Sequence, residues 1–175
     1  MIPPIADARL SPSGPFRCGQ QPKSSCGIVY GADPRQERAT RNPTGIVHGI
    51  AYGADLPVAP VSTLAAIAQY SFNYHGAEYA FTAMDARMGE VYWGEYKKNS
   101  CGYAELIGEE TVIVAEKIVF KGSDGFAAGS GWKMYREDLL AQSRAQISGY
   151  DDDCLPRAAA VALLAAEDAR QGKAV

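Results

Sequence analysis

Two short runs that resemble β-strands, residues 78–83 and 90–96, flank a tight corner in the middle of this chain. Gly89 lies in the corner, where a positive φ angle is easily adopted by glycine. The second run alternates large side chains between its two faces, with Val91 and Trp93 on one and Tyr92 and Tyr96 on the other. The pattern predicts a hairpin whose second strand is covered on both faces.

The corner also contains an acid and a base, Asp85 and Arg87. As functional groups they could polarise a substrate. As structural groups they could bridge the turn, or Asp85 could accept hydrogen bonds from nearby backbone N–H groups, as Asp often does in turns. The corner lacks a nucleophile, a neighbouring histidine and a second acid in a motif, so the structural alternative is favoured.

Residues 44–53 have apolar side chains at helical spacing and predict a helix. Gly45, Gly49 and Gly53 recur at every fourth position, so they form one stripe along it. Each interior glycine costs about 1 kcal/mol relative to alanine. Close approach of another backbone along the stripe would offset that cost. The alternative is that Gly53 ends the helix and the other two glycines are incidental.

The remaining elements follow from shorter signals. Residues 56–61 predict a strand, and Ser62 is an expected N-cap for a helix that ends near Gly76. Further strands are expected at 110–114 and at 126–132, which runs into a glycine corner. A C-terminal helix is expected with its apolar stripe at 155–166. Its expected first turn follows Asp151, Asp152 and Asp153 and contains Pro156, and Gly172 follows its end.

Residues 1–43 differ from the rest because they contain seven of the ten prolines. Proline removes a backbone donor and fixes φ, so regular helices and central strands are disfavoured there. Only residues 27–31 have strand character. An irregular segment is therefore expected over 1–43.

Composition limits the classes of function. The chain is 47% hydrophobic and 21% charged, which is typical of a globular protein. Its net charge is −3, and its 17 Lys and Arg residues are scattered, so direct binding of nucleic acid is not expected. The four cysteines form no C-x-x-C pair, so a disulfide scaffold and a thiolate metal site are not expected. The sequence has neither a signal peptide nor a membrane span, which predicts a soluble cytoplasmic protein.

The motifs that would indicate catalysis or cofactor binding are weak. His48 and His75 lie on separate segments without neighbouring ligands, so no metal site is predicted. Gly129-x-Gly131 lacks the third glycine of a dinucleotide fingerprint and is interpreted as a turn. The run Asp151–Asp153 lacks an EF-hand loop and is interpreted as a helix start. No catalytic residue and no cofactor are therefore predicted.

Three stretches together resemble the bacterial TsaB proteins of the glycoprotease-like (Gcp-like) group. They are TGIVHGIAYGADLPVAPVSTLAAIAQ (44–69), AMDARMGEVYWGEY (83–96) and GSGWKMY (129–135). The resemblance covers about 130 residues, from Thr44 to the end. It implies an α/β fold of the actin-like (ASKHA, RNase H-like) type, with two lobes of mixed sheets flanked by helices. It also implies that residues 44–76 are a remnant of the first lobe and that 77–175 are the second lobe.

The resemblance further implies a non-catalytic protein. It would pair with the catalytic subunit TsaD and with the ATPase TsaE in making threonylcarbamoyladenosine on tRNAs that read codons starting with A. TsaD would hold the metal and contact the substrate, so this chain would meet tRNA only indirectly. The helix at 44–53 would pack against the partner's equivalent helices, with Gly45, His48, Gly49 and Tyr52 at or near that interface. The glycine stripe would then have a physical reason, and self-association into a homodimer is also left open.

The sequence departs from the family in several places. The leading strand with an Asp-Thr-Ser or Asp-Thr-Ala motif is missing, and ADPRQERATRNP (32–43) stands where a G-R-G-P-G-S-F-T-G-x-R stretch is expected. Equal length with unrelated chemistry suggests a pair of compensating frameshifts. The chain also ends before the family's P-V-Y-L-R segment. The hypothesis is a truncated protein whose first lobe is incomplete.

Two other interpretations remain beside the partner protein. An enzyme, either a peptidase or a kinase-like phosphotransferase, would need a His-x-x-x-His metal pair or an acidic, glycine-rich nucleotide site. The sequence contains neither motif. An inactive remnant of a frameshifted gene is the second alternative, and the sequence does not separate it from a working partner protein.

Overall fold

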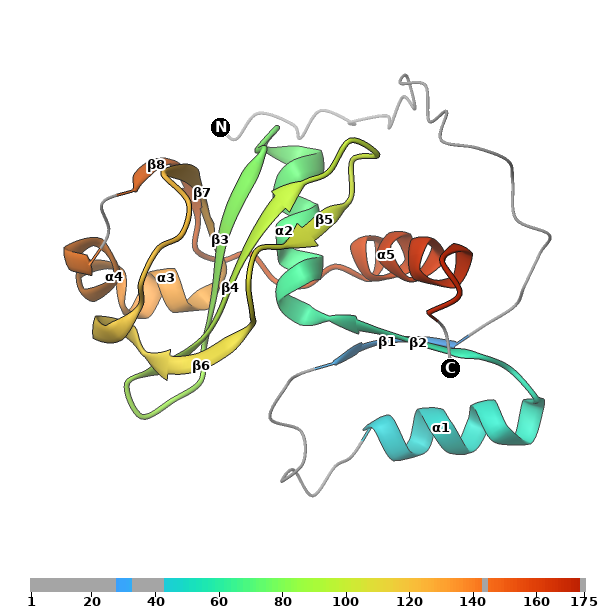
Figure 1. The fold of residues 1–175 in the computed structure, drawn as a ribbon. Helices are drawn as coiled ribbons and strands as arrows, with labels where there is room; N and C mark the ends of the chain where they lie inside the picture. The colour runs from blue at the N-terminus through green and yellow to red at the C-terminus, as the bar shows by residue number, and fades with distance from the viewer. Residues whose placement is uncertain (1–27, 33–42, 143–144, 174–175) are drawn as a thin grey trace, which may run out of the picture.

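The computed structural model describes residues 28–32, 43–142 and 145–173 (Figure 1). The predicted irregular character of 1–43 therefore falls almost wholly outside the described residues. The elements, in chain order, are β1 (Ile28–Ala32), α1 (Pro43–Ala54), β2 (Val58–Ser62), α2 (Thr63–Tyr74), β3 (Tyr79–Asp85), β4 (Glu90–Lys98), β5 (Ala104–Leu106), β6 (Thr111–Val114), the 3₁₀ turn η2 (Ala115–Lys117), β7 (Asp124–Ala128), α3 (Ser130–Met134), α4 (Arg136–Gln142), β8 (Gln146–Asp151) and α5 (Ala158–Arg170).

The larger sheet has the strand order β5-β4-β3-β7-β8, and β6 also pairs with β4. Strands β3 and β4 form the predicted antiparallel hairpin, with Asp85 opposite Val91 at its closed end. Strand β7 runs parallel to β3, and β8 runs parallel to β7. The sheet is therefore mixed, as expected from the family resemblance.

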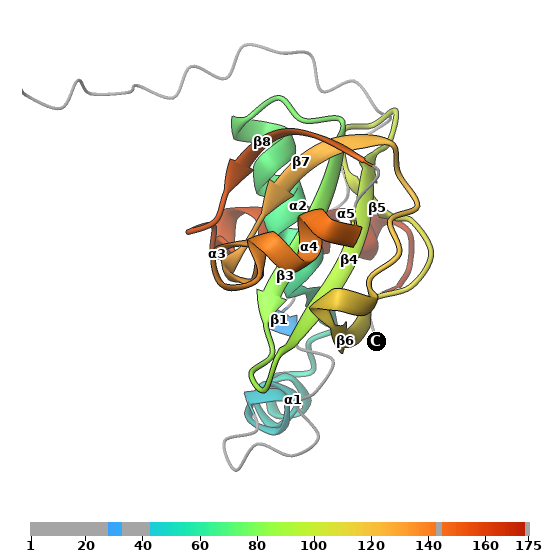
Figure 2. The same cartoon turned by 90° about the vertical axis from the view of Figure 1, so that its left-hand side faces the viewer.

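Both faces of this sheet are covered by helices (Figures 1 and 2). On one face, Leu64 and Phe72 of α2 pack against Tyr96 of β4. On the other face, Trp93 of β4 packs in one cluster with Trp132 of α3. The prediction of a strand buried on both sides is confirmed, and the alternation of β4 side chains is its cause.

The smaller sheet consists of β1 and β2, which pair in parallel with Ile28 opposite Val58. Helix α5 covers one face of it, where Leu164 packs against Val61, and α1 lies on the other side (Figure 1). The last helix of the chain therefore packs on the sheet formed by the first described strands. The division into lobes at residue 76 stays a prediction.

The N-cap of α2 is confirmed, because Ser62 Oγ accepts hydrogen bonds from the backbone N–H groups of Leu64 and Ala65, at 3.2 and 3.4 Å. The predicted start of the C-terminal helix is wrong. Helix α5 has Arg157 as its N-cap, so Pro156 precedes the helix rather than lying in its first turn.

The three aspartates interpreted as a helix start do not serve α5. Each of them instead contacts a basic side chain from another segment. Asp151 pairs with His75 at 3.0 Å, Asp152 with Arg136 at 3.0 Å and Asp153 with Lys133 at 2.6 Å. Because these ion pairs join distant parts of the chain, sequence spacing does not reveal them.

Candidate functional site

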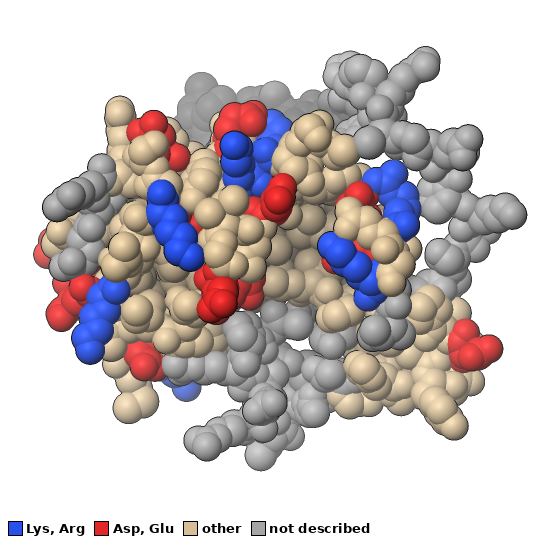
Figure 3. Space-filling view, in the orientation of Figure 1, with Lys and Arg blue, Asp and Glu red and all other residues tan. Residues whose placement is uncertain are grey.

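Helix α1 presents large apolar side chains to solvent. Ile46 is 66% exposed, Ile50 is 58% exposed and Tyr52 is 91% exposed, whereas Ala51 is buried. The helix contains no charged residue. Figure 3 shows this part of the surface, at the lower right, as uncharged except for an acidic group at one edge. An exposed apolar surface of this kind is typical of a protein-interaction site.

Two glycines of the stripe, Gly49 and Gly53, make no close packing contact within the described residues. A Cβ atom added at Gly49 or Gly53 would meet nothing within 4 Å. Gly53 also lies inside the helix, and the positive φ angle of 53° after the helix belongs to Asp55. Gly53 therefore does not end the helix. Close approach of another backbone along the stripe stays a prediction.

The four residues predicted for a partner interface lie on this one helix, and all four are exposed. Gly45 and Gly49 are four residues apart, as are His48 and Tyr52. Residues at this spacing are neighbours on a helix surface, so the four form two adjacent rows. The structure brings these residues onto one surface, and their contact with a partner stays a prediction.

Sequence reasoning missed Ile46 and Ile50 as members of this surface. Both were seen only as apolar residues at helical spacing, which is also the pattern of a helix that packs on a core. The signal that could have identified them is the absence of charged residues from 43–54. A helix without charged residues that lies at the surface of a protein exposes some of its apolar side chains to water.

The corner at Asp85 is bound within the chain. The Asp85 carboxylate accepts hydrogen bonds from the Arg87 backbone N–H at 2.8 Å and from the Tyr135 hydroxyl at 3.2 Å. The Asp85 backbone N–H donates to Ser130 Oγ at 3.2 Å. These contacts fix the hairpin and tie it to the start of α3, which favours the structural alternative.

The Gly129–Gly131 pair forms the turn between β7 and α3. Gly129 has a φ angle of 105°, and a Cβ atom there would clash with the carbonyl oxygen of Ala83. A Cβ atom at Gly131 would lie 2.9 Å from Ala83. The two glycines thus let α3 approach strand β3 closely, and the prediction of a turn is confirmed.

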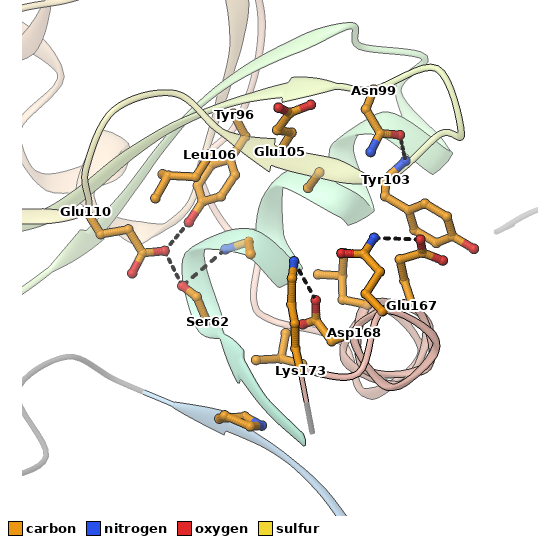
Figure 4. A pocket seen from close by; sticks show the side chains of 16 residues that line it. Ser62, Tyr96, Asn99, Tyr103, Glu105, Leu106, Glu110, Glu167, Asp168 and Lys173 are labelled. Carbon is orange, nitrogen blue, oxygen red and sulfur yellow. Dashed lines mark hydrogen bonds and ion pairs between the residues drawn. The ribbon is translucent and has the colours of Figure 1, made fainter. Parts of the chain in front are cut away.

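A cavity of about 610 Å³ lies between the β2–α2 junction, the β4–β5 hairpin and α5 (Figure 4). The Glu110 carboxylate accepts hydrogen bonds from the hydroxyl groups of Ser62 and Tyr96 at its wall. Burial, and then the charge of Glu110, raise the pKa of Tyr96 above its ordinary value. Asp168 pairs with Lys173 at 3.4 Å. The hydrogen bonds of Glu110 join the two sheets through three separate segments, so no short-range pattern in the sequence predicts them.

Within residues 28–32, 43–142 and 145–173, no group of three or more His, Cys, Asp and Glu side chains could hold a metal ion. His75, one of the two histidines considered, pairs with Asp151 and stacks on Phe126 with ring centroids 4.6 Å apart. None of the described helices is long and apolar enough to cross a bilayer.

Comparison with known proteins identifies a matching protein family. The family model described as TsaD, tRNA N6-adenosine threonylcarbamoyltransferase, matches residues 18–148. The chain belongs to this Gcp-like family.

Two curated members of the family illustrate the relationship. The tRNA threonylcarbamoyladenosine biosynthesis protein TsaB of Escherichia coli is 33% identical over 154 residues, covering 85% of this chain and 65% of the relative. The TsaB protein of Haemophilus influenzae is 34% identical over 119 residues, covering 63% of this chain and 50% of the relative. The chain therefore spans about half to two thirds of the length of these relatives. The resemblance to TsaB proteins is confirmed.

Solved structures of Gcp-like proteins agree. YeaZ from Pseudomonas aeruginosa superposes with a TM-score of 0.74 at 34% identity, covering 85% of this chain and 69% of that one. A second structure, of a protein from the same species described as similar to peptidase YeaZ, has a TM-score of 0.70 at 35% identity. It covers 77% of this chain and 62% of its own. The predicted fold class, an actin-like α/β fold with mixed sheets flanked by helices, is confirmed.

Proposed function

We propose that this chain is a non-catalytic subunit in the synthesis of threonylcarbamoyladenosine on tRNA. It binds a TsaD-type catalytic subunit through α1 and acts together with a TsaE-type ATPase in the cytoplasm. The curated relatives named above are threonylcarbamoyladenosine biosynthesis proteins, which supports the pathway. The partner and the docking mode are inferences from the surface of α1.

The exposed apolar face of α1 is the observation that carries this proposal. A helix that leaves Ile46, Ile50 and Tyr52 in water gains little from the hydrophobic effect within its own chain. Each of these side chains would contribute favourable free energy to binding if a partner covered it. The bare positions at Gly49 and Gly53 allow the partner's backbone to come close.

The family match also supports a partner of related fold. The matching model describes the transferase, whereas the curated relatives at 33% and 34% identity are TsaB proteins. Subunit and partner would then share one fold, and equivalent helices would pack across the interface. A second copy of this chain offers the same fold, so a homodimer is the competing state in the absence of the partner.

Size-exclusion chromatography with light scattering tests the docking step. The chain mixed with the TsaD-type subunit of the same source should elute as a one-to-one complex, whereas Gly49→Leu should not. In cells depleted of their own TsaB, the wild-type chain should restore threonylcarbamoyladenosine in digested tRNA. Separate elution together with failed restoration would instead support the inactive-remnant alternative.

A further inference from the structure

The tip of the β3–β4 hairpin is held in an unusual backbone conformation. Arg87 and Met88 have φ angles of 65° and 57°, and Gly89 follows with 79°. The left-handed region is unfavourable for residues with a Cβ atom, so two consecutive non-glycine residues there are strained. Strained positions that a fold retains are candidates for function.

The strain does not serve the core of this chain. Met88 is 97% exposed, the highest value among the large apolar side chains of the described residues. The turn itself is fixed from inside, by the hydrogen bond from the Arg87 N–H to Asp85 and by that from the Ala86 N–H to the Glu90 carbonyl, at 2.8 and 2.9 Å. The backbone of the turn is thus held by hydrogen bonds while the Met88 side chain extends into water.

The hairpin tip and α1 lie at the same end of the molecule. Both are at the lower end in Figure 1 and again in Figure 2, which is turned about the vertical axis. This end therefore carries four exposed large apolar side chains: Ile46, Ile50, Tyr52 and Met88.

The usual size of a protein interface suggests that α1 and the hairpin tip contact the same partner. A stable and specific interface involves roughly 20–30 residues on each side. Helix α1 has 12 residues, and Ala51 among them is buried. A partner seated on α1 therefore needs further contact surface, and the tip offers an exposed apolar side chain at the same end.

We propose that Met88, presented by the strained Arg87–Gly89 turn, is a second anchor for the protein partner that docks on α1. This inference rests on the proposed function, and its occupant is the TsaD-type subunit. Met88 would enter an apolar depression of that subunit, because a flexible thioether side chain adapts to irregular pockets. The hydrogen bonds of the turn fix the backbone that carries the side chain before binding, which reduces the backbone entropy lost on association.

The test is the affinity of the TsaD-type subunit for four versions of the full chain, measured by surface plasmon resonance. These are wild type, Met88→Asn, Gly49→Leu and Tyr74→Asn. Asparagine tolerates the left-handed region, so Met88→Asn removes the side chain and relieves the strain without unfolding the hairpin. Tyr74 is 60% exposed at the end of α2, which leads into the start of β3, so it lies at the opposite end of that strand from the hairpin tip and is the control.

Met88→Asn should weaken binding at least about fivefold, a size expected for an interface anchor, while Tyr74→Asn matches wild type. If Met88→Asn binds as tightly as wild type while Gly49→Leu loses binding, the inference is overturned and the proposed function stands. No binding by the wild-type chain would overturn both. If Met88→Asn binds the subunit as wild type does but the assembled complex binds tRNA more weakly, the tip contacts RNA instead, and the inference is again overturned.

Discussion

The indole Nε1 of Trp132 donates a hydrogen bond to the backbone carbonyl of Phe81 at 2.8 Å, and both side chains are fully buried. The bond ties α3 to the central strand of the larger sheet. Trp132→Ala should lower the free energy of unfolding by about 3 to 5 kcal/mol, because it opens a cavity in the core. Chemical denaturation measures this, and Met134→Ala on the same helix should stay within about 0.5 kcal/mol of wild type. A loss below about 1 kcal/mol for Trp132→Ala would contradict this packing.

Trp132→Phe separates the hydrogen bond from the bulk of the side chain. It keeps an aromatic ring in the core but leaves the Phe81 carbonyl without this donor. A buried carbonyl deprived of its partner costs about 1 to 3 kcal/mol. Denaturation of Trp132→Phe should therefore show a loss smaller than that of Trp132→Ala. Equal losses would assign the whole effect to the lost hydrogen bond rather than to packing.

The buried carboxylate of Glu95 anchors the segment before β7. It accepts hydrogen bonds from the Tyr79 hydroxyl at 2.7 Å and from the backbone N–H groups of Lys121 and Gly122, each at 2.9 Å. Glu95→Gln should cost about 1.5 to 3 kcal/mol, because it replaces a charged acceptor by a neutral group that also carries donors. Thermal and urea unfolding measure the loss, with exposed Glu105→Gln as the control expected to be neutral.

The hydroxyl of Tyr79 makes alkaline stability depend on pH. Burial, and then the hydrogen bond and charge of Glu95, raise the pKa of Tyr79 above its ordinary value of 10.0. The folded state thus holds the phenolic proton more tightly than the unfolded state does. This contribution is complete below pH 10 and is lost as the pH rises above it. Urea unfolding from pH 9 to 11 should show a shallower decline for Tyr79→Phe than for wild type. Identical declines would show that Tyr79 does not contribute.

Burial also protects the thiol of Cys154. Desolvation, and then the charge of Asp151, raise its pKa from 9.0 to about 12. The thiolate is the reactive form, so the folded chain should react slowly at this position near pH 8. In a background with Cys18 and Cys26 changed to serine, a disulfide reagent should label half-buried Cys101 first and Cys154 only on unfolding. Equal rates at the two positions in folded protein would contradict the burial of Cys154.

The sequence predicted local features well where neighbours in the chain decide the structure. The hairpin was predicted because Gly89 and the alternation of Trp93 with Tyr92 are short-range signals. The Ser62 cap was predicted for the same reason. The start of α5 was mispredicted because Asp151, Asp152 and Asp153 are paired with His75, Arg136 and Lys133, which only the fold brings near.

The candidate site was predicted in part. The glycine spacing and the family resemblance placed Gly45, His48, Gly49 and Tyr52 on one helix surface. They did not show that Ile46 and Ile50 are exposed, since an apolar residue at helical spacing is equally typical of a core. The cavity at Glu110 was not predicted at all, because its walls come from segments far apart in the sequence.

One measurement tests the central claim most directly, namely the stability and the partner affinity of Gly49→Leu determined side by side. A Cβ atom added at this position meets nothing within 4 Å. Leucine stabilises a helix relative to glycine by up to about 1 kcal/mol. The free energy of unfolding should therefore stay equal or rise. The affinity for the TsaD-type subunit, measured by isothermal titration calorimetry, should fall at least about 30-fold.

Ala162→Leu is the matched control, because it adds bulk to the exposed surface of α5, on the other side of the β1–β2 sheet from α1 (Figure 1). It should bind the subunit as tightly as wild type. If Gly49→Leu folds and binds like wild type, the stripe on α1 is not a docking surface and the account of this protein as a partner subunit bound through α1 is wrong.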